Sequence, residues 1–283
     1  MAKKKLTRFE LQMMKENNDP VVWVTAYDFT TAQIAEAAGL DMILVGDSLG
    51  MCVYGYSGTV PVTMEQCLYH CEAIRRAAPN TFVIGDMPFG SYQVSVEEAV
   101  GNAIRFYKEA GMDCVKLEGG RKVTSVIRAI ADAGMLVMGH IGLTPQSTSV
   151  LGGFKAQGRT ADSALALLED ARAVHEAGAF SILVEAVPPE VTKLIRDELP
   201  IPVYGIGAGV HCDGQVMIVS DITGHFQAFT PKFVKRYGDV AGEIRRSFDR
   251  YVKEVKTREF PAPEHTYPMV QGEWEKLRAR LGK

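Results

Sequence analysis

Acidic residues recur at the ends of short apolar runs in this chain of 283 residues. Six runs end in this way, on Asp28, Asp47, Asp86, Glu118, Glu185 and Asp221. Continuous apolar runs separated by helical stretches are typical of strands in a buried parallel sheet. Because the carboxyl ends of the strands of a parallel barrel open on one face, we expect these carboxylates to gather around one mouth. Carboxylates that close repel one another unless a cation, a base or protonation relieves them, so the pattern predicts a metal-assisted active site.

Two of the runs share a local design, in which a glycine precedes the final aspartate. Asp47 and Asp86 have this context, and the helices expected next begin well downstream, near Thr63 and Ser95. An aspartate at a strand end often caps the following helix, but the distance to these helices favours a ligand role. Carboxylates that leave open positions for a substrate suit Mg²⁺. The repeated design therefore predicts a site for a hard divalent cation.

A charged pair interrupts another apolar run. Lys116 and Glu118 lie two residues apart on a predicted strand, so both point to the same face, while Val115 and Leu117 should face the helices. Charges that point into the top of a barrel are costly unless they meet a ligand or an ion. The alternative is a structural salt bridge between Lys116 and Glu118.

Two more polar residues end predicted strands. His140 precedes a long loop and is either a hydrogen-bonded core residue or part of the site. Glu185 ends an apolar run just before Pro188 and Pro189. A carboxylate in such apolar surroundings should have a raised pKa, which suits a general base. The alternative for Glu185 is an interaction with the dipole of the helix that begins at Pro189.

Strand and helix patterns alternate along most of the chain. Helices are predicted at 30–38, 63–78, 95–110, 122–133, 160–177 and 189–199. Further strands at 136–141 and 203–206 bring the strands to eight, the last being 217–221. Eight strand–helix units in one chain predict a (β/α)₈ barrel. The match is uneven, because 210–215 leaves little room for a helix between the last two strands, so a doubly wound sheet remains as the weaker alternative.

Segments outside the repeat complete a single predicted domain over 1–283, with a barrel core at about 20–255. An N-terminal helix is predicted from Thr7 to Lys15. The long loop 144–159 should lie on the same face as the carboxylates, where loops of this length often act as lids. The C-terminal tail 256–283 carries prolines before a short helix at 272–281. We expect the tail to pack on its own barrel or on a neighbouring subunit.

The composition excludes several classes of protein. A net charge of −3 and a pI near 6.1 argue against a nucleic-acid or membrane-surface partner, which would need a basic field. No run approaches the length of a transmembrane helix. The five cysteines lack Cys-x-x-Cys and zinc spacing, as expected of a reduced cytoplasmic protein. The glycine-rich run 205–209 lacks the dinucleotide-binding spacing and predicts a tight turn at the barrel mouth.

Taken in order, these motifs resemble the ketopantoate hydroxymethyltransferase (3-methyl-2-oxobutanoate hydroxymethyltransferase) family. The matching stretches are 24–28, 45–50, 85–89, 115–120, 139–146, 185–188 and 205–209. The resemblance implies a TIM barrel that uses Mg²⁺ and 5,10-methylenetetrahydrofolate. The implied reaction transfers a hydroxymethyl group to 3-methyl-2-oxobutanoate, giving 2-dehydropantoate in the first step of pantothenate biosynthesis.

The resemblance also implies roles for individual residues. The implied ligands of one Mg²⁺ per subunit are Asp47, Asp86 and Glu118, the last directly or through water. The implied contacts with the oxoacid are Asp47, Ser48, Asp86, Lys116 and His140. Glu185 would accept the proton. Members of this family form decamers from two pentameric rings, so the resemblance implies a homodecamer.

The implied chemistry agrees with the residues, and two alternatives stay open. A metal would polarise the ketone and stabilise an enolate, and Lys116 would add positive charge where negative charge develops. No motif indicates the groove for the folate. A barrel of the phosphoenolpyruvate mutase and isocitrate lyase kind would also hold Mg²⁺ and a 2-oxoacid, but its Lys-Lys-Cys-Gly-His loop is absent here. The other alternative is a non-catalytic metal-dependent binding protein, which a single-turnover test would distinguish.

Overall fold

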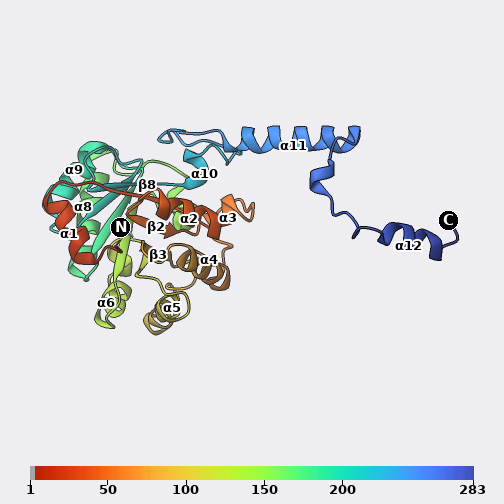
Figure 1. Cartoon of the computed structure of the whole chain (residues 1–283). Coiled ribbons are helices and arrows are strands. Elements are labelled where there is room, and N and C mark those ends of the chain that lie inside the picture. Colours follow the sequence, from red (N-terminus) through yellow and green to blue (C-terminus); the bar gives the residue numbers. More distant parts are fainter. Residues whose placement is uncertain (1–3) are drawn as a thin grey trace.

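A closed barrel of eight parallel strands forms the centre of the molecule (Figure 1). The computed structural model describes residues 4–283. The strands are β1 (Val21–Thr25), β2 (Met42–Val45), β3 (Phe82–Asp86), β4 (Cys114–Glu118), β5 (Val137–Gly142), β6 (Ser181–Glu185), β7 (Val203–Ile206) and β8 (Gly214–Met217). They follow sequence order around the barrel, and pairing of β8 with β1 closes it. The prediction of a (β/α)₈ TIM barrel is confirmed.

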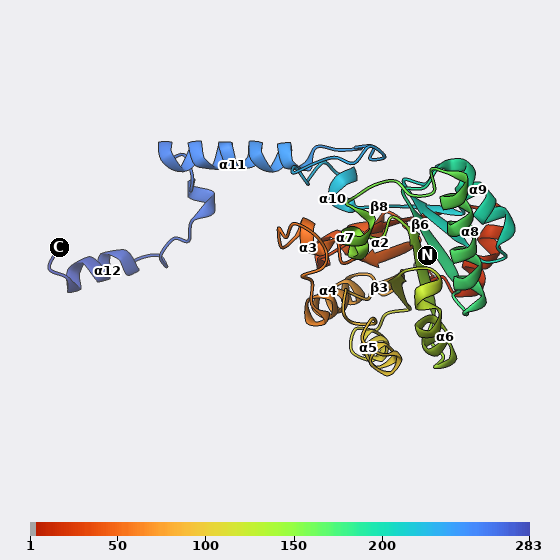
Figure 2. The same ribbon diagram turned by 180° about the vertical axis from the view of Figure 1, so that it is seen from behind.

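Helices surround the barrel and connect successive strands (Figures 1 and 2). The main ones are α2 (Phe29–Ala37), α4 (Met64–Ala77), α5 (Val96–Lys108), α6 (Thr124–Asp132), α8 (Ala161–Glu176) and α9 (Pro189–Glu198). Short helices lie in the loops: α3 (Leu49–Cys52), α7 (Thr148–Leu151) and α10 (Val219–Ile222). Helix starts follow the expected chemistry, because Thr63 and Thr160 each accept a hydrogen bond from the third helical N–H. The N-terminal helix α1 (Arg8–Glu16) is confirmed, with Thr7 as its cap.

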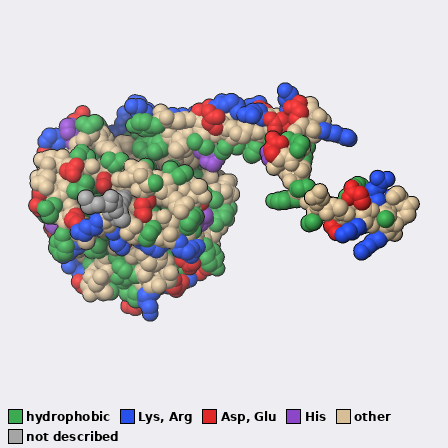
Figure 3. Space-filling model, in the orientation of Figure 1, with side chains coloured by type: hydrophobic (Ala, Val, Ile, Leu, Met, Phe, Trp, Pro, Cys, Tyr) green, Lys and Arg blue, Asp and Glu red, His purple; other side chains and the backbone are tan. Residues whose placement is uncertain are grey.

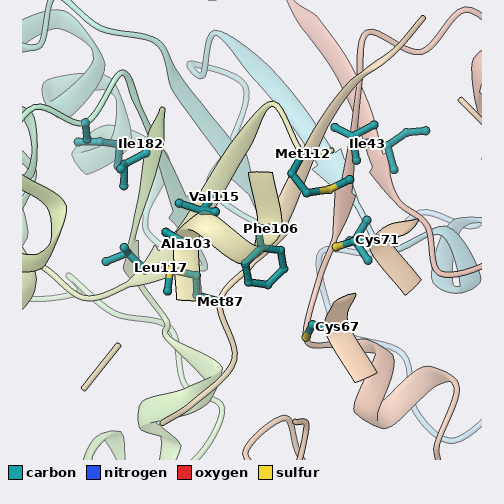
Figure 4. Close-up of a cluster of buried hydrophobic side chains, with 14 of the residues drawn as sticks. Ile43, Cys67, Cys71, Met87, Ala103, Phe106, Met112, Val115, Leu117 and Ile182 are labelled. Atoms are coloured by element: carbon teal, nitrogen blue, oxygen red, sulfur yellow. The ribbon is translucent and has the colours of Figure 1, made fainter. Parts of the chain in front are cut away.

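Apolar side chains form two layers, one inside the barrel and one between the strands and the helices. The inner layer includes Trp23 and Tyr204, whose rings meet edge to face with centroids 5.4 Å apart, and Leu11 of α1 joins it. Figure 4 shows part of the outer layer, in which Phe106 of α5 packs near Val115 and Leu117 of β4. Val115 and Leu117 thus face the helices as predicted, which turns the alternate residues of β4 inward.

The predicted position of the last strand is wrong. Of residues 217–221 only Met217 lies in a strand, because β8 spans Gly214–Met217 and Val219–Ile222 is the short helix α10. Asp213 fixes this register: its carboxylate accepts the Val203 N–H at 2.8 Å, and its backbone oxygen accepts the Val21 N–H at 2.9 Å. Asp221 therefore lies on a helical turn beyond the strand.

Asp28 also has a different role from the one its position predicts. The helix predicted at 30–38 begins one residue earlier, at Phe29, because the Asp28 carboxylate accepts the Thr31 N–H at 2.9 Å and caps α2. Asp28 is exposed and lies after β1 rather than at its end. Of the six acidic strand ends, it is the one that helix capping explains.

A C-terminal arm, residues 240–283, projects away from the barrel (Figures 1 and 2). It contains α11 (Val240–Thr257) and α12 (Glu273–Arg280), and neither helix has a buried residue. The structure therefore does not place the tail on its own barrel, one of the two positions expected for it. The predicted limits of the barrel core, 20–255, stay a prediction. Within residues 4–283, no helix is long and apolar enough to cross a membrane.

Candidate active site

Four charged side chains from β2, β3 and β4 meet at the carboxyl ends of these strands. Asp47 follows β2, Asp86 ends β3, and Lys116 and Glu118 come from β4; each is at most 4% exposed. The Lys116 Nζ lies 2.7 Å from Oδ1 of Asp86 and 4.0 Å from Oε1 of Glu118. The Asp47 N–H donates to Oδ2 of Asp86 at 3.0 Å. The structure brings the four together, and the closest ion pair joins Lys116 to Asp86 rather than to Glu118.

His140 connects this cluster to Glu185. Its Nδ1 lies 3.4 Å from both the Lys116 Nζ and Oε1 of Glu118, and its Nε2 lies 3.2 Å from Oε2 of Glu185. Burial, the largest effect, and Lys116 oppose the charged ring, but Glu118 and Glu185 together raise the pKa of His140 to about 9. His140 is therefore an imidazolium at neutral pH. The expectation that Glu185 lies in apolar surroundings is wrong, because its carboxylate faces this cation.

The balance of charge at the mouth favours a bound cation. Burial raises the pKa of Asp47, and repulsion from Asp86 and Glu118 raises it further. Burial also raises the pKa of Asp86, although Lys116 opposes this. Four carboxylates, including that of Glu185, face one ammonium and one imidazolium, so negative charge is in excess. Within residues 4–283, no three His, Cys, Asp or Glu side chains are already arranged around a metal position. The hard-oxygen donors and the excess charge nevertheless fit a divalent cation.

Gln146, which the sequence analysis missed as a site residue, ties the two sides of the cluster together. Its backbone N–H donates to Oε2 of Glu118 at 2.9 Å, and its side-chain Nε2 donates to Oδ2 of Asp47 at 2.9 Å. Tyr92 donates its hydroxyl to Oε1 of Gln146 at 2.6 Å. Gln146 belongs to the first turn of the loop 144–159 and is 5% exposed. The root of the predicted lid is therefore a fixed part of the site.

Small residues make room for the predicted substrate contact Ser48. The Ser48 hydroxyl lies 2.8 Å from that of Tyr27. A side chain at Gly46 would place its Cβ 2.9 Å from the Ser48 Oγ, so the Ser48 hydroxyl would have to move from its present position. Gly85 has another purpose, because a Cβ at Gly85 would lie 2.5 Å from the ring of Phe106. The two glycines of the repeated design thus serve the site in one case and helix packing in the other.

One cavity of about 430 Å³ contains all seven predicted site residues. These are Asp47, Ser48, Asp86, Lys116, Glu118, His140 and Glu185. Apolar residues of the inner barrel layer, among them Leu44, Leu183 and Ile206, line it as well. Charged and polar side chains therefore stand next to apolar surface in one cavity.

Comparison with known proteins decides between the protein families that the sequence analysis left open. The sequence model of the family "Ketopantoate hydroxymethyltransferase" matches residues 5–263. The chain belongs to this family. A 3-methyl-2-oxobutanoate hydroxymethyltransferase of Alkaliphilus metalliredigens is 64% identical over 279 residues, covering 98% of each chain. One from Geobacillus sp. (strain WCH70) is 49% identical, covering 95% of this chain and 96% of its own. The resemblance inferred from the ketopantoate hydroxymethyltransferase motifs is confirmed, and the family is one of enzymes.

Solved structures with the same fold come from other enzymes. A phosphonopyruvate hydrolase in complex with oxalate and Mg²⁺ superimposes with a TM-score of 0.61 at 16% identity, covering 98% of this chain and 100% of its own. A 2,3-dimethylmalate lyase, a member of the PEP mutase/isocitrate lyase superfamily, gives 0.59 at 16% identity, with 97% and 98% coverage. These values show a shared barrel fold. This chain thus shares its fold with the phosphoenolpyruvate mutase alternative. Its sequence, however, belongs to the ketopantoate hydroxymethyltransferase family.

Proposed function

We propose that the protein transfers a hydroxymethyl group from 5,10-methylenetetrahydrofolate to 3-methyl-2-oxobutanoate. The product is 2-dehydropantoate, and the reaction is the first step of pantothenate biosynthesis, in the cytoplasm. Family membership supports hydroxymethyl transfer and this oxoacid. The observation that carries the proposal is the buried carboxylate cluster beside the His140–Glu185 pair, in one cavity with apolar walls.

Asp47, Asp86 and Glu118 would hold one Mg²⁺ per subunit. Bound there, Mg²⁺ would supply the positive charge that polarises the keto group and stabilises the enolate. Lys116 has its own part in this chemistry: Asp86, Glu118 and Asp47 raise its pKa although burial opposes the charge, so it stays an ammonium. Its charge stabilises negative charge on the oxoacid, and Ser48 and His140 supply hydrogen-bond donors next to it.

Glu185 would take the proton from C3 of the oxoacid. The C–H bond breaks, its electron pair forms the C2–C3 double bond of the enolate, and the proton moves to the carboxylate. C3 then forms the new bond to the methylene carbon of the folate. Over the whole reaction both carbon–nitrogen bonds of that carbon break and water supplies the hydroxyl group of the product. The proton from C3 and one proton from water end on the two nitrogens of the tetrahydrofolate that leaves. His140 lies 3.2 Å from Glu185 and orients this carboxylate.

Exchange of the C3 hydrogen with deuterated water, measured without folate, tests this role. Glu185→Gln keeps the shape and hydrogen bonding of the side chain but cannot accept the proton. We expect exchange to fall by about 10²–10⁴-fold, the usual range for a positioned base, while the oxoacid still binds. Glu190→Gln, an exposed position on α9, is the matched control and should exchange at the wild-type rate. Wild-type exchange in Glu185→Gln would assign the proton transfer to another group.

We further propose that the chain forms a homodecamer of two pentameric rings. The arm supports an assembly, since its apolar side chains find no cover on their own barrel. Sedimentation equilibrium should give ten times the chain mass of 31.0 kDa. A monomeric mass across the working concentration range would exclude the decamer.

A further inference from the structure

A second group of residues lines the same cavity, across the barrel from Lys116 and Glu118. It consists of Asp221 on α10, Phe226, Phe229 and Phe233 from the segment that follows, and Phe154 from the loop 144–159. In the closed strand order, β8 is separated from β4 by three strands in either direction. The segment after β8 therefore faces Lys116 and Glu118 across the barrel. We call these five residues the Asp221 subsite.

Asp221 is a buried carboxylate that no protein group satisfies. It is 6% exposed and lines the cavity, and its side chain makes no hydrogen bond or ion pair within residues 4–283. Burial raises the pKa of Asp221, and Arg236 opposes this only from a distance. A buried carboxylate without a partner costs free energy unless a ligand supplies the missing donors. The cavity is the direction from which such a ligand can come.

The four phenylalanines give the subsite flat apolar walls. Phe226 and Phe229 meet edge to face with ring centroids 5.4 Å apart. Phe233 packs against Gly207, where a Cβ would lie 2.6 Å from its ring. Phe154 and Phe229 are 55% and 51% exposed, so much of their ring surface lacks a partner. Aromatic faces of this kind suit a planar ring ligand.

The size of the cavity indicates a second reactant. Its volume of about 430 Å³ lies in the range of pockets for drug-sized ligands, well above the needs of a five-carbon oxoacid. Lys232 also lines the cavity and is exposed, with no ion pair in the described part of the chain. A ligand with a flat ring and an anionic tail would fit the volume of the cavity, the phenylalanine rings and the charge of Lys232.

We propose that the Asp221 subsite binds a planar heterocycle that presents two adjacent N–H donors, the edge that the pterin ring of a reduced folate offers. The Asp221 carboxylate accepts both donors side by side, as carboxylates do from arginine. The phenylalanines cover the ring faces, and Lys232 attracts the carboxylates of the tail. This inference rests on the proposed function, because it places the one-carbon donor of that reaction.

Calorimetric titration of the full-length protein with 5-formyltetrahydrofolate, a stable reduced folate, tests the subsite. Asp221→Asn keeps the shape but loses the charge and one acceptor, so we expect the Kd to rise by roughly 10- to 100-fold, as for a hydrogen bond to a charged group. Asp197→Asn, on the far end of α9, is the matched control and should bind as wild type does. An unchanged Kd in Asp221→Asn would overturn the inference.

A change in the ligand gives a test that folding of a variant cannot imitate. An analogue that carries a methyl group in place of the 2-amino group lacks one of the two donors. It should bind wild type roughly 10- to 100-fold more weakly, with little further loss in Asp221→Asn, because both changes remove the same contact. Independent, additive losses would place the amino group elsewhere. Asp221→Asn should also melt no lower than wild type, since it removes an unpaired buried charge.

The proposed function is tested separately on the same wild-type samples. Exchange of the C3 hydrogen of 3-methyl-2-oxobutanoate needs no folate, so it reports on the carboxylate cluster alone. Normal exchange in wild type, together with an equal folate Kd in wild type and Asp221→Asn, would overturn the subsite. The proposed function would be unaffected. Absence of both exchange and folate binding in wild type would overturn both.

Discussion

The barrel and the C-terminal arm differ in how far they bury their apolar side chains. Every strand residue of β2, β3 and β4 is buried, and the cavity opens within this packed frame. The 18 residues of α11, in contrast, include no buried one, and Phe248 and Tyr251 are 64% and 56% exposed. Figure 3 shows apolar side chains along the arm among charged ones. The difference shows that the residues of the candidate site lie in a unit that buries its own apolar side chains, whereas the arm leaves its apolar side chains uncovered.

The spacing of the apolar residues of α11 supports this interpretation. Ile244, Phe248, Tyr251 and Val255 recur at helical intervals and form one stripe. Most of the stability of a helix in a protein comes from packing of its apolar face against other elements. A neighbouring subunit that covers the stripe would stabilise the helix and bury the stripe together. Variants of the barrel should therefore change catalysis or folding, and variants of the arm should change assembly.

The largest effect is expected at the barrel mouth. Asp86→Asn replaces an anionic oxygen ligand with a neutral one and weakens the 2.7 Å pair with Lys116. We expect kcat/KM to fall by roughly 10³-fold or more, since metal stabilisation of the transition state amounts to several kcal/mol. The sedimentation mass should stay that of wild type. Full turnover of the purified variant at ordinary Mg²⁺ would remove Asp86 from the ligand set.

The next effect concerns the packed frame of the barrel. Phe106 is fully buried against Gly85, and Phe106→Ala would leave a cavity between α5 and β3. The loss should be about 3–5 kcal/mol in the free energy of unfolding, measured by urea denaturation. A loss below about 1 kcal/mol would show that the side chains around Phe106 repack to fill the space. The barrel would then be less rigidly packed than its comparison with the arm implies.

The loop 144–159 combines both behaviours and should respond to ligands. Its root at Gln146 is buried, while Val150 and Phe154 are 82% and 55% exposed. Limited proteolysis should cut the exposed part of the free protein. Oxoacid and Mg²⁺ at about 100 times their Kd should slow cleavage by up to roughly 100-fold if closure protects the loop. Equal cleavage with and without ligands would contradict the role of a lid.

The smallest effect on the barrel is expected from the arm itself. Phe248→Ser changes an exposed side chain, so the free energy of unfolding of the barrel should change by less than about 0.5 kcal/mol. The mass in sedimentation should fall, because the stripe of α11 loses its central aromatic. Lys253→Ser on the same helix is the control and should keep the wild-type mass. An unchanged mass in Phe248→Ser would show that the apolar stripe of α11 does not contribute to assembly.

Much of the barrel could be predicted because buried parallel strands are simple patterns. Apolar runs gave the first seven strands, and glycines and caps gave the helices between them. The eighth strand escaped because β8 begins with Gly214 and Gln215, whereas the more apolar residues follow. Its position depends on the hydrogen bonds of Asp213 to two other strands, and such long-range bonds leave no local pattern.

The residues of the site also fall into those that a local sequence pattern predicts and those placed by long-range contacts. Asp47, Asp86, Lys116 and Glu118 could be placed together because strand ends in a parallel barrel must meet. Gln146 and Tyr92 could not, because they reach the cluster from loops whose paths depend on packing across the fold. Asp221 lines the same cavity as the other carboxylates, as expected, but it comes from α10 rather than from the strand end predicted for it.

The Lys116–Asp86 pair has a consequence for how the protein matures. Its ammonium is a counterion encoded in the chain, already in contact with a buried carboxylate. The barrel therefore does not need a metal to offset that charge while it folds, unlike small zinc domains that stay unfolded until the ion binds. Folding would therefore be complete before any cation binds, and a chain that lacks the cation would still hold its fold.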